Sequence, residues 1–284
     1  MKIIEVIKKT KAYHNGSFGS EGQVKSIDPS KTRDKILFGN PEIECSGIVT
    51  TLWADINVIE KAHKLGANLI ICHESLFWNH GDQTKWLAYD KNKTYNYKKE
   101  LLENYGIVVW RNHDYVHSGI PMKDGSYVDG IFYGLAETLG WLDYIDINTS
   151  NLIDRSEGWD AFTTFNKVNP LSYDIPETTV GELANLLVKK LNLNGVKAIG
   201  NLEKKISKIS IPFHVLGDAK HTIKLVNDER VDCLLTMEIV DFTLAEYVKD
   251  TSMYNDGIAI IAMGHFNIEE PGMKYMANSI PTAL

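Results

Sequence analysis

Apolar strand-like runs alternate with amphipathic helical segments between residues 46 and 110, and this rhythm constrains the fold more than any other feature. The runs NLIIC (68–72) and IVVW (107–110) each follow a helical segment that ends at a glycine, Gly66 or Gly106. Strands joined by helices of this length pair in parallel and are covered by helices on both faces. We therefore predict an α/β fold with mixed, largely parallel sheets flanked by helices.

The middle of the chain departs from this rhythm, which returns near residue 231. Residues 17–35 are polar, and we expect a loop or a mobile insert there; INTSNLIDRSEG is expected to be a polar connection. The return predicts two interlinked α/β domains, the second inserted into the first. We expect a metal-binding domain of residues 1–125 plus 231–284 and an inserted domain of residues 126–230. Further strands are expected at 161–168, 205–213 and 257–263, and further helices at 130–140, 179–195 and 238–250.

The composition argues against several classes of protein. Hydrophobic residues make up 44% of the 284 residues and aromatic residues 10%, which suits a globular core and not a disordered chain. The net charge of −7 argues against a nucleic-acid partner. No apolar run approaches the ~20 residues that span a bilayer, and lysines interrupt residues 1–16 too often for a secretion signal. Three cysteines are too few for a disulfide scaffold, so we expect a cytoplasmic protein.

Potential metal ligands follow three of the predicted strands at the point where each strand ends. In open α/β sheets, ligands bind just outside the carboxyl ends of the strands, and parallel strands bring those ends to one edge. We therefore expect these side chains to converge at a shared edge. The residues are His73 and Glu74 after NLIIC, His113 and His117 after IVVW, and His265 with Glu269 after GIAIIAM.

Imidazole and carboxylate ligands together favour Zn²⁺, Mn²⁺, Fe²⁺ or Ni²⁺ over Mg²⁺ or Ca²⁺. Even five of these six residues would exceed the four ligands of one structural zinc, whereas two ions sharing a bridging carboxylate would use five and leave positions open for water. Each residue also has a simpler interpretation. His265 and Glu269 are spaced as on a solvated helix face, and His113 could accompany a ligand as an outer hydrogen-bond partner rather than bind metal.

Four segments resemble, in order and spacing, motifs of the Nif-three-like proteins, which are also called the GTP cyclohydrolase I type two family. GANLIICHESLFW is similar to their double-histidine motif, and RNHDYVHSG to their His-Thr-Asn-Leu-Asp segment. LLTMEI resembles their Thr-Gly-Glu segment, and GHFNIEEPG their Gly-His-x-x-x-Glu segment. The resemblance extends from about Ser46 to the C-terminus.

The resemblance implies the Nif-three-like fold, with a dinuclear metal site between two α/β domains and often a ring-shaped homohexamer. Carried over position by position, the family ligands fall on five residues. Two positions depart from the family, because glutamate replaces histidine at 74 and histidine replaces aspartate at 117. The total of three imidazoles and two carboxylates is unchanged. The five expected metal ligands are His73, Glu74, His117, His265 and Glu269.

Two functions are compatible with such a site. The first is a metal-dependent hydrolase in which two divalent ions activate water against a small nucleotide-like or phosphoester substrate, with Glu238 as the candidate catalytic base. The second is a non-catalytic, oligomeric metal-binding or regulatory protein. Both share the metal ligands, and they differ in whether a base and a substrate pocket accompany them.

Overall fold

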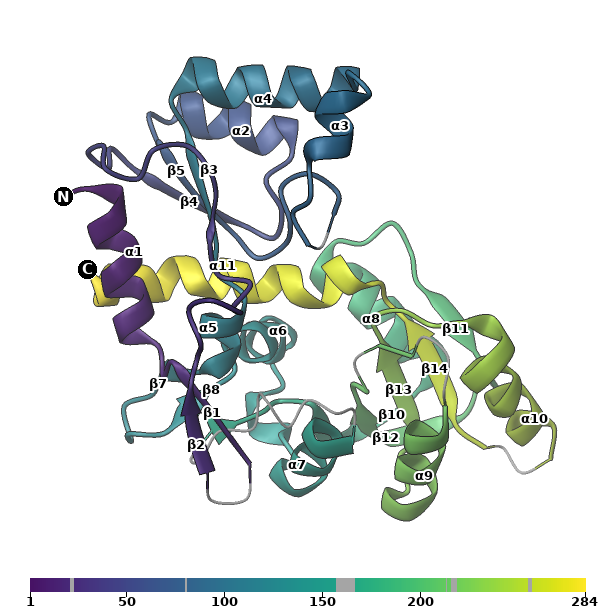
Figure 1. Cartoon of the computed structure of the whole chain (residues 1–284). Helices are drawn as coiled ribbons and strands as arrows, with labels where there is room; N and C mark the ends of the chain where they lie inside the picture. Colours follow the sequence, from purple (N-terminus) through teal and green to yellow (C-terminus); the bar gives the residue numbers. More distant parts are fainter. Residues whose placement is uncertain (21–22, 80, 157–166, 213, 216–218, 255–256) are drawn as a thin grey trace. The chain divides into compact units, whose positions relative to one another are not determined.

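The computed structural model of the chain describes residues 1–20, 23–79, 81–156, 167–212, 214–215, 219–254 and 257–284. These residues form two compact units, coloured along the chain in Figure 1. Unit 1 comprises residues 1–17, 25–130 and 273–284, and unit 2 comprises residues 18–24 and 131–272. Both units carry α/β sheets flanked by helices, which confirms the predicted fold class.

Unit 1 is built on a four-stranded sheet in the order β3-β6-β5-β4. The strands β4, β5 and β6 are parallel, and β3 pairs antiparallel with β6. All four residues of both β5 and β6 are buried, as expected for parallel strands covered on two faces. The strands are β3 Ile36–Phe38, β4 Ile48–Thr51, β5 Leu69–Cys72 and β6 Val108–Arg111.

The helices of unit 1 begin and end where local chemistry predicts. The side chain of Asp55 accepts a hydrogen bond from the backbone N–H of Val58 and caps α2, and Asn92 caps α4 in the same way. Gly106 ends α4 in the left-handed conformation at φ 62°. The helices are α1 Ile3–Tyr13, α2 Ile56–Lys64, α3 Lys85–Tyr89, α4 Lys93–Tyr105 and α5 Asp114–Ser118.

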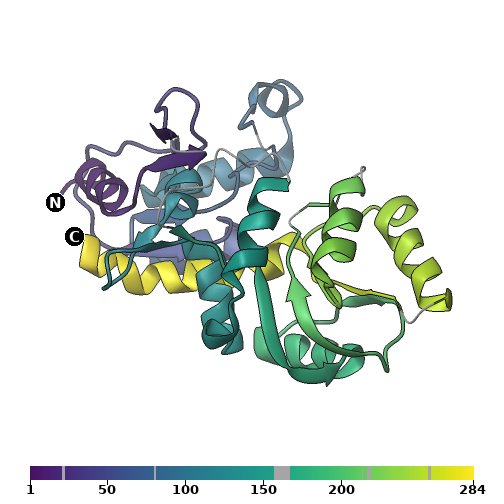
Figure 2. The same cartoon turned by 90° about the horizontal axis from the view of Figure 1, so that it is seen from below.

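Helices cover both faces of this sheet. Buried residues of α2 and α4, including Ile59 and Leu102, form one apolar cluster with Ile70 and Val109 of the strands. The C-terminal end of α11 (His265–Ala283) covers the other face, where the Thr50 hydroxyl donates to the carbonyl of Met273 at 3.0 Å. Figures 1 and 2 both show α1 beside that end of α11.

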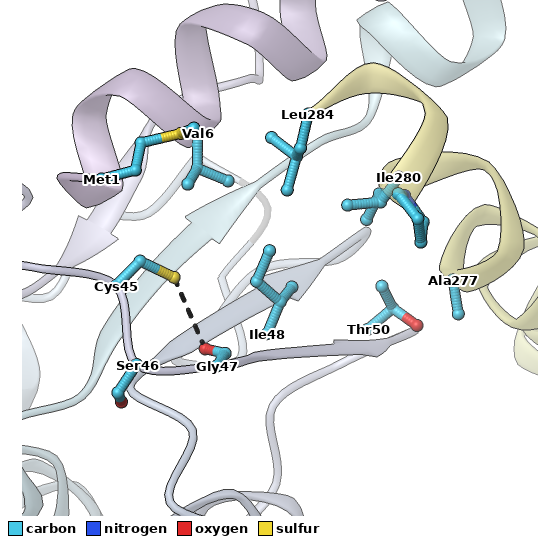
Figure 3. A pocket seen from close by; sticks show the side chains of 11 residues that line it. Met1, Val6, Cys45, Ser46, Gly47, Ile48, Thr50, Ala277, Ile280 and Leu284 are labelled. Atoms are coloured by element: carbon cyan, nitrogen blue, oxygen red, sulfur yellow. Dashed lines mark hydrogen bonds between the residues drawn. The ribbon is translucent and has the colours of Figure 1, made fainter.

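A pocket opens in unit 1 beside β4, between α1 and the end of α11 (Figure 3). Its lining is mainly apolar and includes Val6, Cys45, Ile48, Ile280 and Leu284. The Cys45 thiol donates to the carbonyl of Gly47 at 3.7 Å. No titratable cluster faces this pocket among the lining residues, so it does not resemble a catalytic site.

Short strands join the larger elements. The strands β1 and β2 form a two-stranded sheet within the segment 17–35, where a loop or a mobile insert was expected, so the segment is not a loop throughout. Strands β7 and β8 pair antiparallel directly after α5. Their bounds are β1 Ser17–Ser20, β2 Gln23–Ser26, β7 Ile120–Pro121, β8 Tyr127–Val128 and, further along, β9 Lys167–Val168. The strand expected at 161–168 lies outside the described residues except for β9.

Unit 2 is built on a five-stranded sheet in the order β10-β12-β13-β14-β11. The three central strands are parallel, and the outer strands β10 and β11 are antiparallel to their neighbours. The strands are β10 Ser172–Thr179, β11 Lys197–Ile199, β12 Lys205–Ser210, β13 Cys233–Thr236 and β14 Ala259–Ala262.

The side chains of the central strands alternate between two apolar clusters. Cys233 and Leu235 belong to a cluster that includes Leu183 and Leu187 of α8. Leu234, between them, belongs to a second cluster on the opposite face. The helices are α6 Gly130–Leu139, η1 Leu142–Tyr144, α7 Ile147–Ser156, α8 Val180–Leu191, α9 Lys220–Glu229, η2 Asp241–Ala245, α10 Glu246–Tyr254 and α11 His265–Ala283.

Three sequence predictions need correction here. The polar connection expected at INTSNLIDRSEG contains helix α7, because Asp146 accepts hydrogen bonds from the first turn. The helix expected at 238–250 is broken into the π-helical turn η2 and α10 by non-helical dihedral angles at Phe242 and Thr243. The domain boundary at residue 231 is also wrong, because β13 and β14 pair with β12 inside the sheet of unit 2. Only residues 273–284 return to unit 1.

Among the described residues, no helix combines the length and apolar character that a membrane crossing requires.

Helix α11 passes so close to α6 that only glycine fits at the contact. A Cβ atom on Gly272 would lie 2.4 Å from the Cα of Ile131. We expect Gly272→Ala to lower the free energy of unfolding by roughly 1–3 kcal/mol through overpacking. Gly181→Ala is the matched control, since its Cβ would lie 3.4 Å from the nearest atom and should stabilise α8 slightly. Denaturant titration measures both, and equal stability of the two variants would contradict this packing.

Candidate metal centre

The first group of predicted ligands follows β5. The backbone N–H groups of His73 and Glu74 both donate to the carbonyl of Leu52, at 2.9 and 2.8 Å, and this fixes the chain as it leaves the strand. The side chain of His73 is fully buried, whereas Glu74 is half-buried. His73 therefore projects from the carboxyl end of a parallel strand, where α/β sheets place their ligands.

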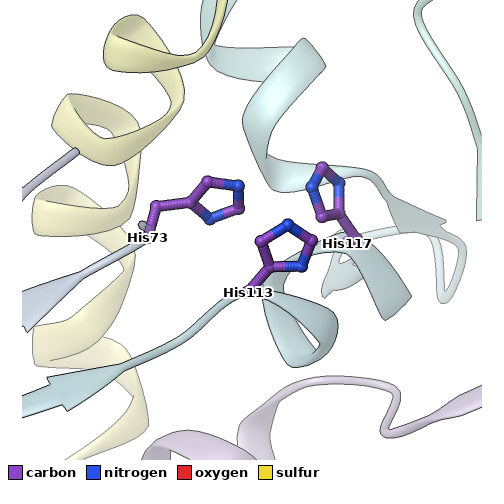
Figure 4. A group of neighbouring side chains, drawn as sticks. All are labelled: His73, His113 and His117. Atoms are coloured by element: carbon purple, nitrogen blue, oxygen red, sulfur yellow. The ribbon is translucent and has the colours of Figure 1, made fainter. Parts of the chain in front are cut away.

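The histidines that follow β6 lie beside His73. Helix α5 begins directly after His113 and includes His117. The rings of His73 and His113 stack with centroids 4.4 Å apart, and the centroid of His117 lies 5.0 Å from that of His73 and 4.9 Å from that of His113. Figure 4 shows the three imidazoles turned toward one another. One ring nitrogen from each lies within 4.8 Å of the other two, so His73, His113 and His117 form a candidate metal-binding group.

Each imidazole of this group uses its Nδ1 atom to contact an oxygen. Nδ1 of His73 lies 3.2 Å from the carbonyl of Asn112, and Nδ1 of His113 lies 3.0 Å from the Asp114 carboxylate. Nδ1 of His117 lies 2.9 Å from the Asp129 carboxylate. Carbonyl and carboxylate oxygens accept hydrogen bonds, so a proton on each Nδ1 satisfies these contacts, and a neutral ring then keeps the lone pair of Nε2 for a metal. Metal-binding histidines in proteins show this same arrangement.

A buried aspartate holds the α5 backbone that carries two of these histidines. The Asp34 carboxylate accepts hydrogen bonds from the backbone N–H groups of His113, Asp114 and Tyr115, at 2.9, 2.6 and 3.4 Å. Burial, together with the nearby Asp114 carboxylate, raises the pKa of Asp34 to about 6. Thr32 links the two carboxylates, since its hydroxyl lies 3.0 Å from Asp34 and 2.8 Å from Asp114.

The charges around His113 favour its neutral, metal-binding form. Burial and the neighbouring imidazole of His73 hold the pKa of His113 well below its usual value. Burial alone would raise the pKa of Asp114, but the hydrogen bond from His113 and the bonds from Arg33 and Thr32 hold it below its usual range. Asp114 therefore stays ionised and accepts the Nδ1 proton of His113.

The second group of predicted ligands lies in unit 2. Helix α11 begins at His265, and Glu269 follows one turn later, with 2.9 Å between Nε2 of His265 and Oε2 of Glu269. Glu238 follows β13, and its carboxylate accepts hydrogen bonds from two imidazoles, with Oε1 2.6 Å from Nδ1 of His265 and Oε2 bonded to Nδ1 of His214. His214, Glu238 and His265 form a second candidate metal-binding group.

His265 has a carboxylate at each of its ring nitrogens. A neutral imidazole has one proton and can donate to only one of two carboxylates. Either a second proton or a cation shared by Nε2 of His265 and Glu269 balances the other contact. Burial would raise the pKa of Glu238, but the hydrogen bonds from His214 and His265 lower it to about 2. Glu238 is therefore an ionised group that orients His265.

The single sheet edge predicted for all these residues is wrong. Strands β5 and β6 belong to the four-stranded sheet, whereas β14 belongs to the five-stranded sheet. His73, Glu74 and His117 lie in unit 1, and His265 and Glu269 lie in unit 2. Within unit 1, the structure brings His73 and His117 together, and within unit 2 it brings His265 and Glu269 together. Their role as metal ligands stays a prediction.

Several partners of these residues were not predicted from the sequence. His113, left open as a ligand or an outer partner, lies inside the group of three histidines. His214, which has no partner at ligand spacing in the sequence, bonds to Glu238. Asp129 and Asp34 are not part of any recognised motif. Asp129 lies 12 residues from His117 along the chain, and Asp34 lies 79 residues from His113, and each hydrogen-bonds to that histidine. Only Asp114, adjacent to His113, could have been found from its position.

Comparison with known proteins identifies the family. The model of the Duf34/NIF3 (NGG1p interacting factor 3) family matches residues 128–284, more than half of the chain. The chain belongs to this family. The match includes Glu238, His265 and Glu269 and begins after the three histidines of unit 1. The resemblance seen in the sequence motifs is therefore confirmed at the level of the family.

Three other proteins are similar to this chain in sequence or in fold. A Clostridium acetobutylicum protein named GTP cyclohydrolase 1 type 2 homolog is 23% identical over 249 residues, covering 88% of this chain and 81% of that protein. The crystal structure of Staphylococcus aureus protein SA1388 matches with a TM-score of 0.63 at 16% identity, covering 99% of this chain and 92% of that one. A Bacillus cereus protein related to NIF3 gives 0.62 at 16% identity, with 99% and 94% covered. At this identity the structures show the fold.

The low pKa of Glu238 predicts how its contribution to stability varies with pH. Its stabilising effect is present above the pKa of an unfolded glutamate, near 4.5, and is lost as the pH falls toward about 2. In chelator-treated protein, we expect wild type to be more stable than Glu238→Gln at pH 5.5 and the difference to shrink by pH 3. Glu177→Gln, at an exposed ion pair with Lys205, is the control and should show little pH-dependent difference. A constant gap for Glu238→Gln would contradict the charged pairing.

Proposed function

We propose that this Duf34/NIF3 protein is a divalent-metal-dependent hydrolase that carries two transition-metal ions. His73, Glu74 and His117 of unit 1 and His265 and Glu269 of unit 2 are the proposed ligands. The observation that carries the proposal is the orientation of three imidazoles. His73, His117 and His265 each contact an oxygen through Nδ1. This arrangement presents Nε2 to a metal and is typical of catalytic and structural metal sites.

The chemistry proposed for such ions is the activation of water. When bound, a transition-metal ion would lower the pKa of a water molecule toward neutrality and so supply a nucleophile for hydrolysis. Glu238 is the candidate base, because its ionised carboxylate lies 2.6 Å from an imidazole that is itself a proposed ligand. A small nucleotide-like or phosphoester substrate is proposed on the resemblance to the GTP cyclohydrolase type 2 homologue.

The setting proposed for this activity is a homohexamer in the cytoplasm. The hexamer rests on the family resemblance alone. The cytoplasmic location is supported by Cys45, Cys72 and Cys233, which are all free thiols, as a reducing compartment favours.

Turnover measurements on metal-free and metal-loaded protein test the hydrolase. The chain is stripped with chelator, separated on a size-exclusion column with light scattering, and assayed against nucleotides and phosphoesters with Zn²⁺, Mn²⁺, Fe²⁺ or Ni²⁺ restored. We expect a hexamer whose turnover requires added metal and falls at least tenfold in Glu269→Ala, which loses a ligand. Glu270→Ala, at the neighbouring position of the same helix, is the control. Metal binding without turnover on any substrate would favour a non-catalytic metal-binding or regulatory protein instead.

A further inference from the structure

The structure assigns His113 a role beyond the five proposed ligands: we propose that His73, His113 and His117 together form a three-imidazole site that holds one zinc-like divalent ion within unit 1. The inference rests on the proposed metal binding and deepens it, because it names the ligand set and the class of ion for one of the two positions.

The geometry of the three rings supports a shared ion. One nitrogen from each ring lies within 4.8 Å of the other two, and all three side chains are nearly buried. A tetrahedral zinc ion bonds to each imidazole nitrogen at about 2.0–2.1 Å, which places such nitrogens about 3.3 Å apart. Side-chain rotations that move each ring nitrogen by roughly an ångström would therefore bring the three nitrogens to the spacing of a zinc site. Three protein nitrogens leave the fourth position of the ion for water.

His113 is held as firmly as the two histidines predicted to bind metal. Its Nδ1 atom lies 3.0 Å from the Asp114 carboxylate, just as Nδ1 of His117 lies 2.9 Å from that of Asp129. Its backbone N–H donates to Asp34 at 2.9 Å. A histidine that only oriented another ligand would direct a ring N–H toward that ligand, whereas Nδ1 of His113 is engaged by Asp114. His113 therefore presents the same nitrogen as its neighbours.

The charges nearby match a dication. Three neutral imidazoles leave the two positive charges of the ion uncompensated, and burying a net charge is costly. Asp114 and Asp129 are 8% and 4% exposed, and each hydrogen-bonds to an imidazole of the group. Two carboxylates in the outer layer balance the charge, so the site does not need a carboxylate ligand. An all-nitrogen inner layer favours Zn²⁺ or Co²⁺ and disfavours Mg²⁺ and Ca²⁺.

The test isolates this site in the full-length chain. In the His265→Ala background, unit 2 loses an imidazole ligand, and the protein is stripped with chelator and titrated with Co²⁺ and Zn²⁺. We expect one ion per chain to remain, with Mg²⁺ unable to compete. Adding His113→Gln should weaken the binding of this ion by roughly 100-fold or more. Loss of a residue that only hydrogen-bonds to a ligand costs 10–100-fold in metal affinity, and loss of a ligand should cost more. Adding His63→Gln is the matched control, because His63 is an exposed histidine stacked on Tyr105 in the same unit.

A second measurement does not depend on the folding of a His113 variant. Zinc-edge X-ray absorption on His265→Ala loaded with one equivalent counts the imidazoles around the ion, and we expect three. Two imidazoles, or an unchanged affinity in the His113→Gln variant, would overturn the three-imidazole site while leaving the proposed hydrolase standing. Wild-type protein that holds no ion at micromolar Zn²⁺ would overturn both proposals.

Discussion

The hydrogen bond from an imidazole Nδ1 to a fixed oxygen is the interaction on which both candidate metal groups depend. A hydrogen bond at one ring nitrogen fixes the orientation of an imidazole, and it also sets which nitrogen carries the proton. The carbonyl of Asn112 and the carboxylates of Asp114 and Asp129 hold the rings of unit 1, and Glu238 holds the ring of His265 in unit 2. The lone pairs that could bind metal are thus oriented before any ion arrives.

The sheets supply the rigidity that these hydrogen bonds need. His73 directly follows β5, which pairs in parallel with a strand on each side. His113 follows β6, one of these two neighbouring strands. Asp34 adds a long-range restraint, because its carboxylate accepts three backbone N–H groups at the start of α5. In unit 2, Glu238 and His265 follow β13 and β14, which are adjacent parallel strands. Neighbouring strands therefore place the members of each group.

Much of the fold and part of the site could be predicted from the sequence. The apolar run before His73 and the glycine that ends α4 are local signals, and both predicted correctly. The strands β13 and β14 were assigned to the wrong domain because strand pairing is not a local signal. The pairing of Cys233 with Ile209, for example, depends on the register between strands that are distant in the sequence. The partners Asp34 and Asp129 were missed for the same reason. Hydrogen bonds between residues far apart in the chain leave no periodic pattern in the sequence.

The tautomers of the histidines in the metal-free protein test the preorganisation most directly. Long-range ¹⁵N–¹H spectra of protein labelled at histidine, with assignments from single substitutions, report which ring nitrogen carries the proton. We expect His73, His113 and His117 to be neutral with the proton on Nδ1 at neutral pH, and added Zn²⁺ to shift their Nε2 resonances. A proton on Nε2 in any of the three, or Nε2 resonances that do not respond to Zn²⁺, would contradict the orientation of these rings for metal binding.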